Sequence, residues 1–119
     1  MDEYTEILTH GFPVPDFQNF YREVIKQIDK DFRPSADLAI PEGVITPDWI
    51  YTSLNNMVNT IVADQNSVLG SIIYRVDLPE KQVRKAMINK GIQEKPEELT
   101  RMILRREAQK VWIRHHFNG

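Results

Sequence analysis

Residues 46–77 read TPDWIYTSLNNMVNTIVADQNSVLGSIIYRVD, and no other part of the chain has so long a regular pattern. At 100° per residue, the apolar side chains of this stretch fall on one face of an α-helix. These side chains are Ile50, Leu54, Met57, Val58, Ile61, Val62, Val68, Leu69, Ile72, Ile73 and Val76. The pattern predicts a helical scaffold on which the smaller helices pack.

A polar cluster from Asp64 to Ser67 leaves the number of helices in this stretch open. One continuous helix of about 30 residues would be about 45 Å long. It would place Gln65 in the middle of the apolar face, where a buried amide needs hydrogen-bond partners. The alternative is a bend or break at the cluster, which gives two helices.

Pairs of a proline and an acid indicate where the helices begin. Proline is tolerated in the first turn of a helix, and the acid meets the positive end of the helix dipole. The pairs are Pro15-Asp16, Pro47-Asp48, Pro79-Glu80 and Pro96-Glu97. Besides the central stretch, we expect helices over Asp16–Phe32, Pro79–Asn89 and Pro96–His116. The expected fold class is all-α, a compact bundle of four to five helices in a single domain over residues 1–119.

The helix from Asp16 to Phe32 has one apolar stripe that includes four aromatic side chains. The stripe consists of Phe17, Phe20, Tyr21, Val24, Ile25, Ile28 and Phe32, and the charged residues Arg22, Glu23, Lys26, Lys30 and Asp31 lie off it. The aromatic residues could line a ligand pocket. We favour core packing, because aromatic side chains supply large buried areas.

Two segments lack a long helical pattern. Residues 1–14 contain only a short apolar-periodic turn before Gly11 and Pro13, so we expect an arm or loop there. Residues 33–45 form a connector that is longer than most links between helices. Its apolar residues predict that it packs on the bundle. They are Leu38, Ile40, Val44 and Ile45.

Composition excludes several functional classes. The 119 residues include no cysteine, which excludes disulfides and thiol nucleophiles. His10 has no other His, Asp or Glu at metal-ligand spacing, and the adjacent His115 and His116 would point about 100° apart on a helix, so we expect no metal and no cofactor. The acidic N-terminus does not resemble a secretion signal, and no apolar run is long enough to span a membrane. We therefore expect a cytoplasmic protein.

The net charge of -2 hides an asymmetry along the chain. Residues 1–79 contain 5 Lys/Arg and 12 Asp/Glu, whereas residues 80–119 contain 10 Lys/Arg and 5 Asp/Glu. Either the two parts form separate surfaces for different partners, or the basic helices pair with acidic residues of the same chain. We favour the second explanation.

The last helix has a pattern that exceeds what a core requires. One apolar face contains Leu99, Met102, Ile103, Ile113 and Phe117, and a second contains Leu104, Ala108 and Val111, so the helix is expected to lie between neighbours. A row of mainly basic and aromatic residues lies between these faces, and it consists of Arg101, Arg105, Gln109, Trp112 and His116. This row, the predicted stripe, is either a binding surface for an anionic partner or a solvated face whose tryptophan covers a neighbouring helix.

Arg106 and Lys110 differ from the stripe, because they project into the first apolar face. Burial of an unpaired charge is costly, so both side chains must reach solvent or meet carboxylates. We favour structural ion pairs with acidic residues of the N-terminal part. The alternative is a partly buried cationic site that binds a ligand carboxylate or phosphate.

Enzyme signatures are missing, since the sequence has no Gly-rich phosphate loop, nucleophile elbow or HExxH motif. One resemblance involves Ile73-Tyr74-Arg75-Val76-Asp77 and the later segment Ile103-Leu104-Arg105-Arg106-Glu107 with Gln109-Lys110. These segments resemble a group of small uncharacterised bacterial helical proteins. The resemblance implies an all-helical fold and brings no activity, substrate or cofactor.

The expected function is therefore a non-enzymatic interaction or structural protein with a protein partner or self-association. The alternative is binding of nucleic acid or another polyanion through Arg101, Arg105, Trp112 and His116. No membrane partner is expected.

Overall fold

The computed structural model describes residues 3–9, 14, 16–33, 38–64, 68–79, 81–85 and 96–118. Its named helices are α1 (Glu3–Thr9), α2 (Phe17–Phe32), α3 (Pro47–Asp64), α4 (Val68–Val76) and α6 (Glu97–Asn118). Residues 81–85 are also helical, and the described residues contain no strand. The chain has a radius of gyration of 13.9 Å. The prediction of a compact all-α fold is confirmed.

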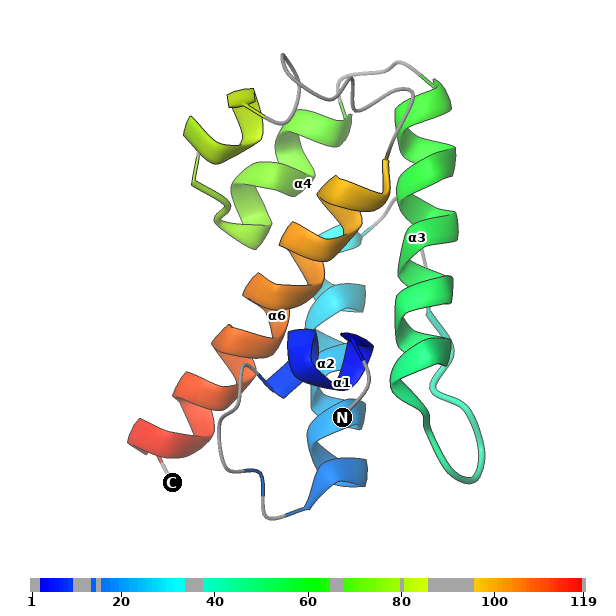
Figure 1. Cartoon of the computed structure of the whole chain (residues 1–119), viewed down its shortest axis with the longest axis vertical. Coiled ribbons are helices and arrows are strands. Elements are labelled where there is room, and N and C mark those ends of the chain that lie inside the picture. Colours follow the sequence, from blue (N-terminus) through cyan, green and yellow to red (C-terminus); the bar gives the residue numbers. More distant parts are fainter. Residues whose placement is uncertain are drawn as a thin grey trace.

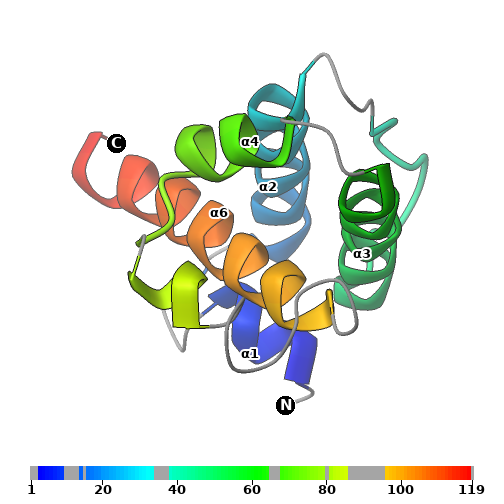
Figure 2. The same cartoon turned by 90° about the horizontal axis from the view of Figure 1, so that it is seen from above.

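The last helix, α6, is the centre of the fold. It packs against α1, α2, α3 and α4, and it crosses the middle of the molecule in both views (Figures 1 and 2). The side chains that α6 places in the core are fully buried, and they are Leu99, Ile103, Leu104, Ala108 and Val111. The prediction that this helix lies between neighbours is confirmed. The prediction that the other helices pack on residues 46–77 is confirmed for the named helices, since α1, α2 and α6 each contact α3 or α4. The sequence did not indicate that α6, the longest helix, would be equally central.

The central stretch forms two helices. One helix ends at Asp64, the next begins at Val68, and they point in clearly different directions (Figure 1). Gln65 lies outside the described residues. The apolar residues of both helices still face the core, since Ile50, Leu54 and Val76 are fully buried or nearly so. Each helix keeps its own apolar face, and the change of direction brings both faces onto α6.

Residues 3–9 correct the expectation of an arm or loop at residues 1–14. They form α1, whose Ile7 and Leu8 are buried. Tyr4 stacks on Tyr51 of α3 with the ring centroids 4.4 Å apart. A helix of 7 residues is too short to be stable alone, so packing against α3 and α6 holds it in place. His10 lies outside the described residues.

Local signals set the ends of α2 and α3 as expected. The backbone N–H of Asn19 donates to the Asp16 carboxylate at 3.1 Å, which caps α2. The backbone N–H of Trp49 donates to the Thr46 hydroxyl at 3.2 Å, which caps α3. Most of the aromatic stripe of α2 is buried, although Phe17 is 43% exposed.

The connector between α2 and α3 packs only in part. The Gln18 side-chain amide donates to the Ile45 carbonyl and accepts from its N–H, both at 2.8 Å. Ile45 is thereby buried, but Val44 is 80% exposed. The expectation that all four apolar residues of this connector pack on the bundle is wrong for Val44 and for Ile40, which is 37% exposed. Next to Val44, Ile45 takes the inward position.

The helix α4 ends in a tight turn at Asp77, which has a φ of 67°. The N–H of Leu78 donates to the Ile73 carbonyl at 3.2 Å, and the N–H of Asp77 donates to the Tyr74 carbonyl at 3.1 Å. These two bonds form a Schellman motif, which requires a left-handed residue at this position. Of the short helix expected over Pro79–Asn89, residues 81–85 are helical with Val83 buried, and the remainder from residue 86 lies outside the described residues.

Candidate functional site

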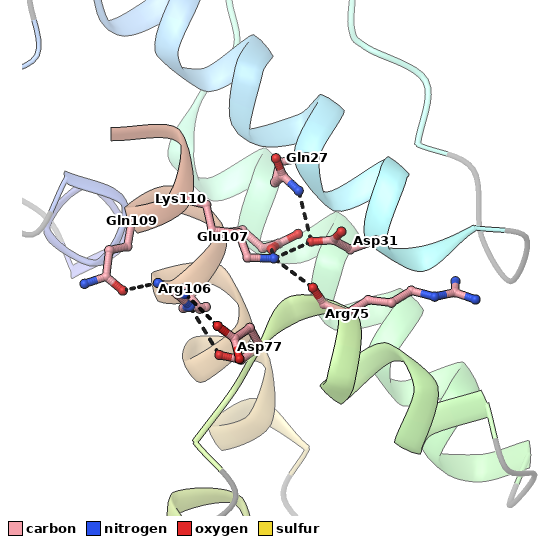
Figure 3. Close-up of polar contacts among 8 residues, drawn as sticks. All are labelled: Gln27, Asp31, Arg75, Asp77, Arg106, Glu107, Gln109 and Lys110. Carbon is pink, nitrogen blue, oxygen red and sulfur yellow. Dashed lines mark hydrogen bonds and ion pairs between the residues drawn. The ribbon is translucent and has the colours of Figure 1, made fainter. Parts of the chain in front are cut away.

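Arg106 is held by the turn that ends α4. Its Nη2 lies 2.9 Å from Asp77 Oδ2, and its Nε donates to the Asp77 carbonyl at 3.2 Å (Figure 3). Its Nη1 donates to Gln109 Oε1 at 2.8 Å. The left-handed conformation of Asp77 presents both its carboxylate and its carbonyl to the same guanidinium. Arg106 therefore joins α6 to the end of α4.

Lys110 joins three helices at one point. Its Nζ lies 2.8 Å from Asp31 Oδ2 on α2 and donates to the Arg75 carbonyl at the end of α4, at 2.9 Å. It also lies 3.2 Å from Glu107 Oε1, one turn earlier on α6. Lys110 therefore donates hydrogen bonds to Asp31 and to the Arg75 carbonyl, and it lies at ion-pair distance from Glu107. Arg106 pairs with Asp77 and Lys110 pairs with Asp31. Both of these aspartates belong to residues 1–79, the acidic part of the chain.

Glu107 is the most unusual charged residue of the described chain, because its side chain is 0% exposed. Its carboxyl oxygens accept no hydrogen bond from the described residues, although Oε1 lies 3.2 Å from Lys110 Nζ. Burial raises the pKa of Glu107 to about 9, with further contributions from the hydrogen bond and negative charge of Asp31, against the opposing effect of Lys110. Glu107 is therefore protonated at neutral pH, and its O–H group donates a hydrogen bond to the Asp31 carboxylate.

Asp31 is the ionised member of this carboxyl pair, the name used below for Asp31 and Glu107. Burial alone would raise its pKa, but hydrogen bonds from Glu107, Lys110 and Gln27 and the positive charge of Lys110 hold the pKa of Asp31 below its ordinary value. The Gln27 amide donates to Asp31 Oδ2 at 3.1 Å. At neutral pH the group therefore contains one neutral acid, one carboxylate and one ammonium.

An open pocket of about 290 Å³ lies beside this group, between α2 and α6. Its lining residues are Gln27, Arg106, Lys110, Ile113 and Arg114, and we call it the cationic pocket. Arg106, Lys110 and Arg114 follow one another at intervals of four residues, so they form a line along α6. Arg114 is exposed and forms no ion pair with the residues that the structure describes.

Sequence analysis missed Gln27, Ile113 and Arg114 as neighbours in a pocket. The spacing of Arg114 from Lys110 was available as a signal, whereas the contribution of Gln27 depends on how α2 packs on α6. Ile113 was expected on a core-facing side of the last helix, and this expectation is wrong. It is 38% exposed because the end of α6 extends beyond the helices that cover its middle (Figure 1).

The predicted stripe does not gather into one site. The Nε of Arg101 lies 3.0 Å from Glu3 Oε1, so this arginine is engaged by α1. Trp112 is half-buried against the core and stacks on His116 with the ring centroids 4.7 Å apart. Arg105 and His116 are exposed. Arg101 and His116 are about 22 Å apart along the helix axis, at 1.5 Å per residue.

Residues 113–116 are all exposed. Successive residues of a helix point 100° apart, so four exposed residues in a row show that most of the helix circumference is accessible to solvent there. We call residues 112–116 the exposed helix end. In both views this part of α6 lies at the periphery of the molecule (Figures 1 and 2). Phe117, the remaining member of the first apolar face, has no side chain among those described.

Within the described ranges, no group of three His, Asp or Glu side chains could hold a metal ion. No helix there is long and apolar enough to span a membrane. Comparison with known proteins gives no match to a family model, a curated protein or a solved structure. The resemblance to small bacterial helical proteins stays a prediction.

Proposed function

We propose that the protein is a non-enzymatic interaction protein that binds an acidic protein partner through the exposed helix end and the cationic pocket. The observation that carries this proposal is the accessibility of the exposed helix end. Arg114 has no ion pair with the described residues, and Ile113 is 38% exposed. Arginine and aromatic residues dominate the binding energy of many protein interfaces, and an apolar residue beside them adds buried area.

The carboxyl pair supports binding over catalysis. Paired acids with separated pKa values are typical of acid–base sites, but a catalytic acid must reach the proton that it transfers. Glu107 has no exposed side-chain surface and does not line the cationic pocket. Its role in this proposal is structural and electrostatic. A cytoplasmic location and a bacterial origin belong to the same proposal, on the sequence features described above.

A photo-crosslinking experiment tests the proposed function. Benzoylphenylalanine at His115 should give a discrete crosslinked species in native cells, and Ile113→Asp should remove it because a charge replaces the apolar contact. The same probe at Asn59, an exposed residue on α3, is the matched control. Equal crosslinking from both positions would contradict the proposal. The mass of the species distinguishes another protein from a second copy of the chain.

Nucleic-acid binding is the second candidate, favoured by the exposed Arg105 and by the stacked rings of Trp112 and His116. An aromatic platform beside a cation suits an unpaired base and its phosphate. A gel shift with generic DNA and RNA across a salt series tests it. A salt-sensitive shift that is lost in Arg101→Ala/Arg105→Ala would support this candidate, and the absence of a shift at low salt would exclude it.

A further inference from the structure

The charges around the cationic pocket leave a surplus of one positive charge. Arg106 is balanced by Asp77, and Lys110 is balanced by Asp31. With Glu107 neutral, Arg114 is the one cation lining this pocket whose charge has no counterpart among the described residues. A ligand with a single negative charge would neutralise this surplus positive charge, whereas a phosphate group with two negative charges would leave an excess of one negative charge.

The hydrogen-bond donors and the apolar wall of the cationic pocket further restrict the chemical class of ligand that it can bind. Arg114 has no hydrogen bond or ion pair with the residues that the structure describes, whereas Lys110 is engaged by Asp31, by the Arg75 carbonyl and by Glu107. Ile113 forms an apolar part of the wall. We propose that the cationic pocket binds a single carboxylate next to an apolar group, supplied by an acidic side chain of a partner. The fully buried carboxyl of Glu107, 3.2 Å from Lys110, adds no negative charge to this pocket while it keeps its proton. This inference rests on the proposed function.

The other charged groups near Glu107 do not alter this count. On α2, Glu23 pairs with Lys26 at 3.8 Å and Asp29 pairs with Arg33 at 2.7 Å, so each of these pairs is neutral, and Lys30 is exposed to solvent. At the end of α4, Arg75 presents its carbonyl to Lys110 while its guanidinium points away and donates to the Arg33 carbonyl (Figure 3).

The two remaining helices that pack on α6 contribute no further charge to this group. The buried residues of α1 are Ile7, Leu8 and Thr9, and its Glu3 pairs with Arg101. From residue 49 to residue 63, α3 contains no charged side chain. Asp31 and Lys110 are therefore the charges that act directly on Glu107.

Ionisation of Glu107 would remove the surplus positive charge of the cationic pocket. It would add a negative charge 3.2 Å from Lys110, and the pocket with its supporting carboxylates would become neutral. Because charge attraction and proton binding are linked, a bound carboxylate should in turn make Glu107 harder to ionise. The carboxyl pair thus sets the charge that a partner meets in the pocket.

NMR titration tests the ligand class. The probe is the peptide acetyl-Leu-Glu-Leu-amide, and its matched control is acetyl-Leu-Gln-Leu-amide. We expect the acidic peptide to shift the Ile113 methyl and Arg114 Nε–H signals with a Kd of about 1 mM, and the neutral peptide to leave them unchanged. Arg114→Gln should weaken binding about tenfold, while Arg105→Gln, on another side of α6, should not. Equal loss in both variants would overturn the pocket assignment.

Two further ligands separate the possible sources of the anion. Sodium hexanoate carries the same carboxylate without a peptide, so binding as tight as that of the acidic peptide would assign the pocket to small carboxylates and overturn the partner. Inorganic phosphate that binds more tightly than the peptide would overturn the monoanion assignment. If the peptide leaves the pocket signals unchanged while crosslinking at His115 persists, this inference fails and the proposed function stands.

The pH dependence of binding tests the role of Glu107. Peptide affinity should be constant from pH 6.5 to 8 and about fourfold weaker at pH 9.5, where most Glu107 would be ionised given a pKa of about 9. Glu107→Gln, which mimics the protonated acid, should bind equally well at every pH. A wild-type affinity that does not change up to pH 9.5, or the same loss in Glu107→Gln, would overturn this role of Glu107.

Discussion

Lys110 on α6 and Asp31 on α2 lie 2.8 Å apart although 79 positions separate them in the sequence. Their side chains are 19% and 9% exposed, so the pair is shielded from solvent. Replacement of one partner leaves the other charge buried without its counterion, which is strongly destabilising.

We therefore expect Lys110→Met to lower the free energy of unfolding by about 3 kcal/mol. Urea denaturation followed by circular dichroism measures this change. Lys30→Met, at an exposed lysine on α2, is the control and should change stability by less than about 0.5 kcal/mol. The double variant Asp31→Asn/Lys110→Met should recover part of the loss. If Lys110→Met is as stable as the control, the pair does not hold the helices together.

Glu107 should make the protein less stable as the pH rises. The pKa of Glu107 is about 9 in the folded chain, and its ordinary value, which applies to the unfolded chain, is 4.5. Between pH 4.5 and about pH 9, the unfolded chain therefore loses a proton that the folded chain keeps. The free energy of unfolding should fall with a contribution of about 1.4 kcal/mol per pH unit from this group. Below pH 4.5 the contribution of Glu107 to the free energy of unfolding is fully present. Above about pH 9 this contribution has been lost and does not change further with pH.

Glu107→Gln removes this titration and keeps the shape of the protonated side chain. We expect the variant to match the wild type near pH 4.5 and to be more stable at pH 8, measured by urea denaturation across that range. Asp31 should act in the opposite direction in acid, because its lowered pKa gives stability that is lost as the pH falls through the folded value. A parallel pH dependence in wild type and Glu107→Gln would contradict the assignment.

Asp77 combines a left-handed backbone with an ion pair to Arg106, and two substitutions separate these roles. Asp77→Gly keeps a residue that tolerates a φ of 67°, whereas Asp77→Ala does not. Both remove a carboxylate that is 75% exposed, whose pair with Arg106 is of the kind that contributes little to stability. We expect Asp77→Gly to be more stable than Asp77→Ala by about 1 kcal/mol in urea denaturation. Equal stabilities would mean that the turn is unstrained.

Leu8 tests whether α1 belongs to the core. Its side chain is 0% exposed, so Leu8→Ala should cost about 3 kcal/mol of stability. Glu6→Ala, on the exposed side of the same helix, is the control and should cost little. Thermal and urea denaturation measure both variants. An equal, small effect of the two would mean that α1 is not docked on α3 and α6.

The elements with strong local signals could be predicted from the sequence. The periodicity of residues 17–32 and the capping side chain of Asp16 act within a few residues, so α2 begins and ends where expected. The helix α1 could not be predicted in this way, because its stability comes from contacts with distant residues. The polar cluster that begins at Asp64 allowed either one continuous helix or two helices. The structure contains two, and both pack on α6.

The candidate site depended more on long-range contacts. Burial required carboxylates near Arg106 and Lys110, but local spacing could not identify Asp77 and Asp31. Asp31 lies off the apolar stripe of α2 and is nevertheless buried, because Lys110 covers it. Glu107 precedes Lys110 by three residues, a spacing that is typical of exposed ion pairs. Its complete burial follows from the helices around α6, which no local pattern indicates.

The central position of α6 has a consequence for how the chain folds. During synthesis, α1 to α4 emerge before the helix that covers their apolar faces exists, so those faces stay exposed until residues 97–118 are complete. Contacts between distant segments form slowly, and exposed apolar surface promotes aggregation while they form. We expect nascent chains that stop before residue 97 to depend on chaperones, and release of α6 from the ribosome to complete the folding of the whole domain at once.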